Sequence, residues 1–115
     1  LFITDLRTEQ LTNPLGLDTP QPRFSWRIGS EKRNIIQTTY RLLVASSPEL
    51  LNENQADVWD TGEVCSDTSI WINYQGLPLQ PNKRYYWKVW VKTNTDESTW
   101  SETAFWGMGL MGETH

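Results

Sequence analysis

Polar and apolar residues alternate without interruption from Arg84 to Lys92. Successive side chains of a β-strand point to opposite faces of a sheet, so this alternation predicts a long antiparallel strand with one buried face. The row expected to face the core is Tyr85, Trp87, Val89 and Val91. The row expected on the outer face is Arg84, Tyr86, Lys88, Trp90 and Lys92. We expect the inner row to form the centre of the core.

The approach to this strand carries a second signal. Leu79 and Pro81 precede Tyr85, which lies at the start of the strand and just after a turn. A tyrosine in this place is typical of the tyrosine corner of Greek-key sandwiches, where the hydroxyl bonds to backbone a few residues upstream. The sequence therefore predicts that the Tyr85 hydroxyl contacts the preceding turn.

Shorter segments with strand character lie on both sides of the long strand. We predict strands at 3–7, 23–28, 37–46, 58–62, 63–65, 69–73 and 99–110. The side chains expected to face inward in the second and third of these are Phe24, Trp26, Ile28, Tyr40, Leu42 and Val44, and those expected to face outward are Thr39, Arg41 and Leu43. In 69–73 we expect Ile70 and Ile72 on one face and Trp71 on the other.

The connections contain little helix. Residues 11–22 are rich in proline, which fixes φ and favours extended conformations in the residue before it. Ser47 followed by Pro48 is a typical helix start, so one short helix is expected after the third strand. These features predict an all-β, antiparallel immunoglobulin- or fibronectin III-like sandwich of about seven strands. We assign residues 1–110 to the sandwich and 111–115 to the start of a linker, so that the chain is expected to be one domain of a longer protein.

Composition excludes several classes of function. The net charge of −4 gives no general attraction to nucleic acid or to an anionic membrane. No apolar run approaches the roughly 20 residues of a membrane-spanning helix. The only histidine is His115, and Cys65 is the only cysteine, so neither has a partner for a catalytic triad or a metal site. The acidic residues are dispersed, and we expect no catalytic pair, metal or cofactor in this chain.

One motif superficially suggests a dinucleotide site. The glycines at 107, 109 and 112 match the pattern G-x-G-x-x-G. That fingerprint requires a helix after the motif and a βαβ unit around it, and the chain shows neither pattern. We therefore interpret these glycines as a flexible exit from the domain.

Two groups of aromatic and apolar residues are candidate contact sites. If Phe105 faces the core, then Trp106, Met108 and Leu110 form an outward apolar stripe, and such patches mark interfaces. The outer row of the long strand, with Trp100 beside it, is favoured as a packing ladder of cations on aromatic faces. The alternative is a stacking surface for sugars, for which the candidates are Trp71, Tyr86, Trp90 and Trp100.

The sequence also resembles a known family. The segments Leu6-Arg-Thr-Glu9, Asn13-Pro-Leu-Gly16 and Pro22-Arg-Phe-Ser-Trp26 resemble the opening of bacterial α-L-rhamnosidases of glycoside hydrolase family 78. The resemblance continues to Phe105-Trp106 and covers nearly the whole chain. It implies an N-terminal immunoglobulin- or fibronectin III-like domain that precedes further β-domains and an α/α barrel. The carboxylates that invert the configuration of a terminal α-L-rhamnoside belong to that barrel, so none is carried over to this chain.

Three functions are consistent with these observations. The first is a non-catalytic accessory domain of a periplasmic or extracellular α-L-rhamnosidase, with the downstream domains of the same polypeptide as its partners. The second is a carbohydrate-binding module that recognises rhamnose-containing glycans through exposed aromatic side chains. The third is a protein-binding fibronectin III domain of a surface protein. Fold alone does not choose among them, because one fold supports many functions.

Overall fold

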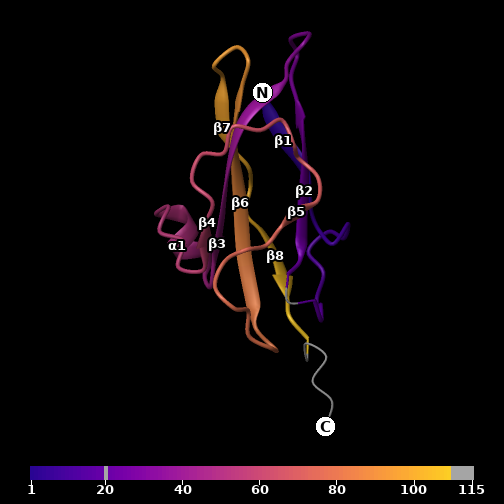
Figure 1. The fold of residues 1–115 in the computed structure, drawn as a ribbon, viewed down its shortest axis with the longest axis vertical. Helices are drawn as coiled ribbons and strands as arrows, with labels where there is room; N and C mark the ends of the chain where they lie inside the picture. The colour runs from indigo at the N-terminus through magenta and orange to yellow at the C-terminus, as the bar shows by residue number, and fades with distance from the viewer. Residues whose placement is uncertain (20, 110–115) are drawn as a thin grey trace.

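The chain forms two antiparallel sheets that pack face to face, as a computed structural model of residues 1–19 and 21–109 shows (Figure 1). The smaller sheet has the order β1-β2-β5, with bounds Phe2–Thr8, Arg23–Gly29 and Ile72–Asn73. The larger sheet has the order β4-β3-β6-β7, with bounds Trp59–Asp60, Gln37–Ala45, Arg84–Thr93 and Ser98–Trp100. Strand β8 (Ala104–Gly107) also pairs with β6, and the short helix α1 spans Pro48–Asn52. The predicted β-sandwich with one short helix is confirmed.

Strand β6 is the centre of the molecule (Figure 1). It pairs with β3 along one edge and with both β7 and β8 along the other. Its predicted inner row, Tyr85, Trp87, Val89 and Val91, is buried in the main core. Phe24 of β2 packs against this row from the opposite sheet, with its ring centroid 4.9 Å from that of Trp87. Trp26 is buried beside it, as predicted, and donates its indole N–H to Gln37 Oε1 at 2.8 Å.

The tyrosine corner is also confirmed. The backbone N–H of Gln80 donates to the hydroxyl oxygen of Tyr85 at 2.8 Å. Leu79 is buried against the same core, so the turn is held by one apolar contact and one hydrogen bond. These two contacts position the entry to β6.

The outward assignment of Leu43 is wrong. Leu43 is completely buried in a second, smaller cluster with Ala45 and Leu51. The reason is helix α1, which covers the outer face of β3 and contributes Leu51 as its buried residue. The larger sheet is therefore apolar on both faces where the helix lies.

The single strand predicted at 99–110 is divided into β7 and β8. Trp90 pairs with Trp100 in β7, whereas Trp87 pairs with Ala104 in β8, so the register along β6 shifts by one residue. The extra residue lies between 101 and 103. Because side chains alternate with a period of two, a one-residue shift moves every following side chain to the other face.

This shift contradicts the predicted outward stripe. Trp106 is fully buried and Met108 is nearly so, and both belong to the main core. Phe105 instead takes the outer face, where it is half-buried. Leu110, the third member of the stripe, and the assigned linker at 111–115 lie outside the described residues.

The predicted strand at 69–73 is shortened to Ile72–Asn73. Trp71 has φ of +59°, in the left-handed region, which interrupts the extended backbone. As a result Ile70 is exposed, whereas Ile72 packs against the core. The segment 63–65 makes only an isolated bridge, between Val64 and Tyr40.

Candidate functional site

The outer face of β6 carries the predicted row of cations and aromatic rings. Lys88 Nζ lies 4.3 Å from the centroid of Trp100, and Arg84 Cζ lies 4.9 Å from the centroid of Phe105. Tyr86 and Trp100 also pack against the small cluster beneath α1. Partial burial lowers the pKa of Lys88. These contacts agree with the packing ladder favoured from the sequence.

Trp71 lies apart from this row, beside the smaller sheet. It is 48% exposed, and the guanidinium carbon of Arg23 lies 4.1 Å from its ring centroid. Arg23 in turn binds Glu9, with Nε 2.9 Å from Oε2, and this contact lowers the pKa of the Glu9 carboxyl. The structure therefore does not unite the four predicted stacking residues: Tyr86, Trp90 and Trp100 share one face, and Trp71 belongs to another part of the surface.

A hollow of about 400 Å³ lies next to Trp71. The connection from β4 to β5 crosses from one sheet to the other (Figure 1). Residues of this connection line part of the hollow. Its lining residues are Tyr40, Trp59, Asp60, Thr61, Val64, Trp71, Ile72, Asn73 and Gln75. Sequence reasoning identified only Trp71 as a candidate here. The polar members lie on segments that are distant in sequence, so no local motif brings them together.

Asp60 is the charged residue of this hollow, and its charge is compensated. Its carboxylate accepts hydrogen bonds from Arg41 Nε at 3.0 Å and from Arg41 Nη2 at 2.7 Å. The backbone N–H of Gly62 donates to the same carboxylate at 2.8 Å. The contact with Arg41 lowers the pKa of Asp60, so it is ionised and paired at neutral pH.

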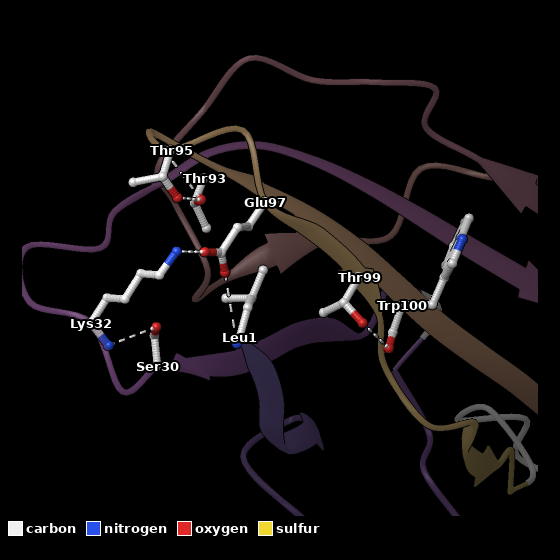
Figure 2. Close-up of polar contacts among 8 residues, drawn as sticks. All are labelled: Leu1, Ser30, Lys32, Thr93, Thr95, Glu97, Thr99 and Trp100. Carbon is white, nitrogen blue, oxygen red and sulfur yellow. Dashed lines mark hydrogen bonds and ion pairs between the residues drawn. The ribbon is translucent and has the colours of Figure 1, made fainter.

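A second hollow, of about 540 Å³, lies between the first residues of β1 and the segment 99–104. At the nearby turn that follows β6, Glu97 forms an ion pair with the Lys32 ammonium, and its Oε2 lies 3.9 Å from the backbone nitrogen of Leu1 (Figure 2). The contact with Lys32 lowers the pKa of Glu97. Figure 2 also shows the hydroxyls of Thr93 and Thr95, which lie 3.0 Å apart. These contacts join loops from both sheets, so we assign them a structural role.

The described residues contain neither a candidate metal-binding cluster nor a candidate membrane-spanning helix. In residues 1–19 and 21–109, no group of three or more His, Cys, Asp or Glu side chains could hold a metal ion. Cys65 is exposed. Within the same residues, no helix is long and apolar enough to cross a membrane.

The glycines at 107 and 109 are held by backbone contacts. Leu17 N donates to Gly107 O at 2.8 Å, and Gly109 N donates to Leu17 O at 2.6 Å. A Cβ atom on Gly109 would lie 2.6 Å from Asp18 Oδ1 and 3.0 Å from Gly16 O, so only glycine permits this close approach. The interpretation of this segment as a flexible exit is therefore wrong for residues 107–109, and Gly112 lies outside the described residues.

The two packed antiparallel sheets define an immunoglobulin-like β-sandwich. Residues 3–112 match the family model described as Rha78A-like, N-terminal immunoglobulin domain. The chain belongs to this family. The resemblance that we inferred from the opening segments of the sequence is confirmed.

Comparisons with individual proteins agree with this family assignment. The chain is 42% identical over 106 residues to an alpha-L-rhamnosidase of Formosa agariphila, and 42% identical over 113 residues to one of Streptomyces avermitilis. These alignments cover 90% and 97% of this chain. The structure of alpha-L-rhamnosidase from Dictyoglumus thermophilum has a TM-score of 0.93 with 41% identity, over 98% of this chain and 13% of that one. The chain spans 11% of the length of the two curated relatives.

Proposed function

We propose that this chain is a non-catalytic accessory domain of an α-L-rhamnosidase. The observation that carries the proposal is the family match over residues 3–112, together with relatives about nine times as long. The complete protein hydrolyses terminal α-L-rhamnosides with inversion of configuration, at carboxylates that lie outside this chain. It acts in the periplasm or outside the cell, as we predicted from the resemblance.

The accessory role is to pack against the domains that follow in the same polypeptide. The end of the sandwich near β8 supports this role, because its loops are joined by backbone hydrogen bonds. Met108 N donates to Lys83 O at 2.8 Å, and Asn82 N donates to Gly109 O at 3.0 Å. Leu15 projects from the same end and is 64% exposed. A rigid end with an exposed leucine provides a firm attachment for a neighbouring domain.

Two measurements test this proposal. The chain alone, incubated with p-nitrophenyl α-L-rhamnopyranoside, is expected to release no nitrophenolate, whereas the complete protein releases it. In the complete protein, Leu15→Asp is expected to lower the unfolding temperature and to make this domain more sensitive to protease. Its control is Ile36→Asp, because Ile36 is 55% exposed but lies at the opposite end of the sandwich, next to Asn94.

Hydrolysis by the chain alone contradicts the non-catalytic role. Equal behaviour of the Leu15 and Ile36 variants contradicts packing through the β8 end. The two outcomes are independent, so each part of the proposal is tested separately.

A further inference from the structure

Trp71 has an unusual backbone conformation for its residue type. Among the described residues, the other non-glycine positions with positive φ are Asp, Asn, Glu or Gln, and Trp71 is the one aromatic residue. Bulky side chains rarely adopt this region, and strain of this kind is concentrated at functional sites. Here the strained position holds a large indole ring at the surface, between two hollows.

The two sides of this ring differ. Arg23 lies over the ring and lines the smaller hollow, of about 80 Å³. Arg23 does not line the larger hollow, of about 400 Å³, although Trp71 does. Trp71 therefore borders the larger hollow without Arg23 beside it there. The volume of this hollow falls within the range of about 300–1,000 Å³ common for small-molecule sites.

The larger hollow also presents polar groups without protein partners. Tyr40 is only 8% exposed, and its hydroxyl makes no hydrogen bond to any described residue, yet Tyr40 lines the hollow. The side-chain amides of Asn73 and Gln75 are exposed and likewise make no hydrogen bond within residues 1–19 and 21–109. The Tyr40 hydroxyl is not among the buried polar atoms that lack a partner, which are Thr8 Oγ1 and Trp87 Nε1. It is therefore accessible from the hollow, where it can donate to and accept from a polar ligand.

The charges select the class of ligand. The single charged side chain that lines the hollow is Asp60, and Arg41 already neutralises it through two hydrogen bonds. An anionic ligand would meet a carboxylate, and a cation would have to displace Arg41. A neutral molecule that combines an apolar face with several hydroxyl groups meets neither obstacle.

We propose that this hollow binds a neutral saccharide. The open face of Trp71 stacks against the C–H face of a sugar ring, because an aromatic face offers a large apolar area. The Tyr40 hydroxyl and the amides of Asn73 and Gln75 exchange hydrogen bonds with the sugar hydroxyls, since both groups donate and accept. This inference assigns sugar binding to Trp71 and leaves Tyr86, Trp90 and Trp100 in the packing ladder.

A nuclear magnetic resonance titration of the 115-residue chain tests the inference. The probes are L-rhamnose and the neutral disaccharide α-L-rhamnosyl-(1→6)-D-glucose, each added up to about 50 mM, a range that detects dissociation constants near 1 mM and well above it. The expected result is a saturable shift of the Trp71 indole N–H and of the Gln75 amide. No saturable shift with either sugar, or shifts confined to Trp90 and Trp100, overturns the proposal.

Substitutions distinguish saccharide binding in the hollow from binding elsewhere on the surface. Trp71→Ala is expected to weaken binding at least tenfold, and its matched control is Trp100→Ala, because each indole is partly exposed and carries one cation over its ring. Tyr40→Phe retains the buried ring and removes only the hydroxyl, so a loss of about fivefold is expected with the fold intact. Equal affinities of the Trp71 and Tyr40 variants and the unmodified chain contradict the assignment.

The inference does not depend on the proposed accessory role. The titration measures binding by this chain alone, whereas the accessory role is tested by hydrolysis and by unfolding of the complete protein. A failure of the saccharide titration therefore does not contradict the accessory role, and a failure of the accessory role does not contradict saccharide binding.

Discussion

Tyr85 shows how a single side chain can fix a turn. Its ring belongs to the main core, stacked 5.4 Å from the ring of Trp106 by centroid distance, and its hydroxyl oxygen accepts the N–H of Gln80. The ring position is set by apolar burial, and the hydroxyl then determines where the preceding backbone lies. One residue thus joins the turn at 80–83 to the centre of the sandwich.

We predict that Tyr85→Phe lowers the free energy of unfolding by about 1 kcal/mol, because the Gln80 N–H loses its acceptor while the ring stays in place. Chemical denaturation followed by tryptophan fluorescence measures this change. Tyr86→Phe is the control: Tyr86 lies on the outer row, and its hydroxyl makes no hydrogen bond to the described residues. A loss in the control as large as that in Tyr85→Phe would contradict the role of the corner.

At the scale of the element, the shift between β7 and β8 decides which residues form the core. Ser101 holds the transition, since its N–H donates to Val89 O at 2.8 Å and its hydroxyl accepts the N–H of Val89 at 3.0 Å. Trp100 and Trp106 are an even number of residues apart and would share a face in a continuous strand. The additional residue instead places Trp100 outside and Trp106 in the core.

This arrangement predicts unequal effects at neighbouring positions. Trp106→Ala is expected to reduce the free energy of unfolding by about 3–5 kcal/mol, because it leaves a large cavity in the core. Phe105→Ala, one residue away on the outer face, is expected to cost only about 1 kcal/mol. Equilibrium denaturation of both variants checks the difference. Similar losses would indicate that β8 does not have the register described above.

The same element explains which parts of the structure could be predicted from sequence. The inner row of β6 and the corner at Tyr85 follow from alternation and local spacing, and both are confirmed. The bulge between β7 and β8 has no strong local signal, so the sequence predicts one strand at 99–110 and does not show whether Phe105 or Trp106 faces the core. Leu43 was misplaced for a related reason, since its burial depends on helix α1, a contact between separate elements. The hollow at Trp71 combines segments that no motif connects.

For the whole molecule, three ion pairs join residues that are distant in sequence. Glu9 joins Arg23, Asp60 joins Arg41, and Glu97 joins Lys32. In each carboxyl the hydrogen bond to its cation is the main cause of a lowered pKa. These pairs are partly exposed, so each contributes modestly to stability.

Stability is accordingly expected to depend on pH. A carboxyl whose pKa is lower in the folded state stabilises the fold above its unfolded-state pKa, and this contribution is lost as the pH falls through the folded-state pKa. We predict that the unfolding temperature decreases between about pH 5 and about pH 3. The variant Asp60→Asn is expected to have a lower unfolding temperature than the unmodified chain at neutral pH. Its unfolding temperature is also expected to decrease less between these pH values. Calorimetry measures both quantities. Asp67→Asn is the control, because Asp67 is exposed and forms no ion pair with the described residues. If the unfolding temperature depended on pH in the same way in the unmodified chain and in both variants, the role of Asp60 would be contradicted.

The position of Cys65 has a practical consequence. It is the chain's only cysteine, and its thiol is exposed one residue after Val64, which lines the hollow and pairs with Tyr40. A thiol-directed fluorophore would therefore attach at one defined place, one residue along the chain from a residue that lines the proposed saccharide site, without any engineered change to the chain. Through its single cysteine the molecule already carries an attachment point for an optical reporter of what occupies that hollow.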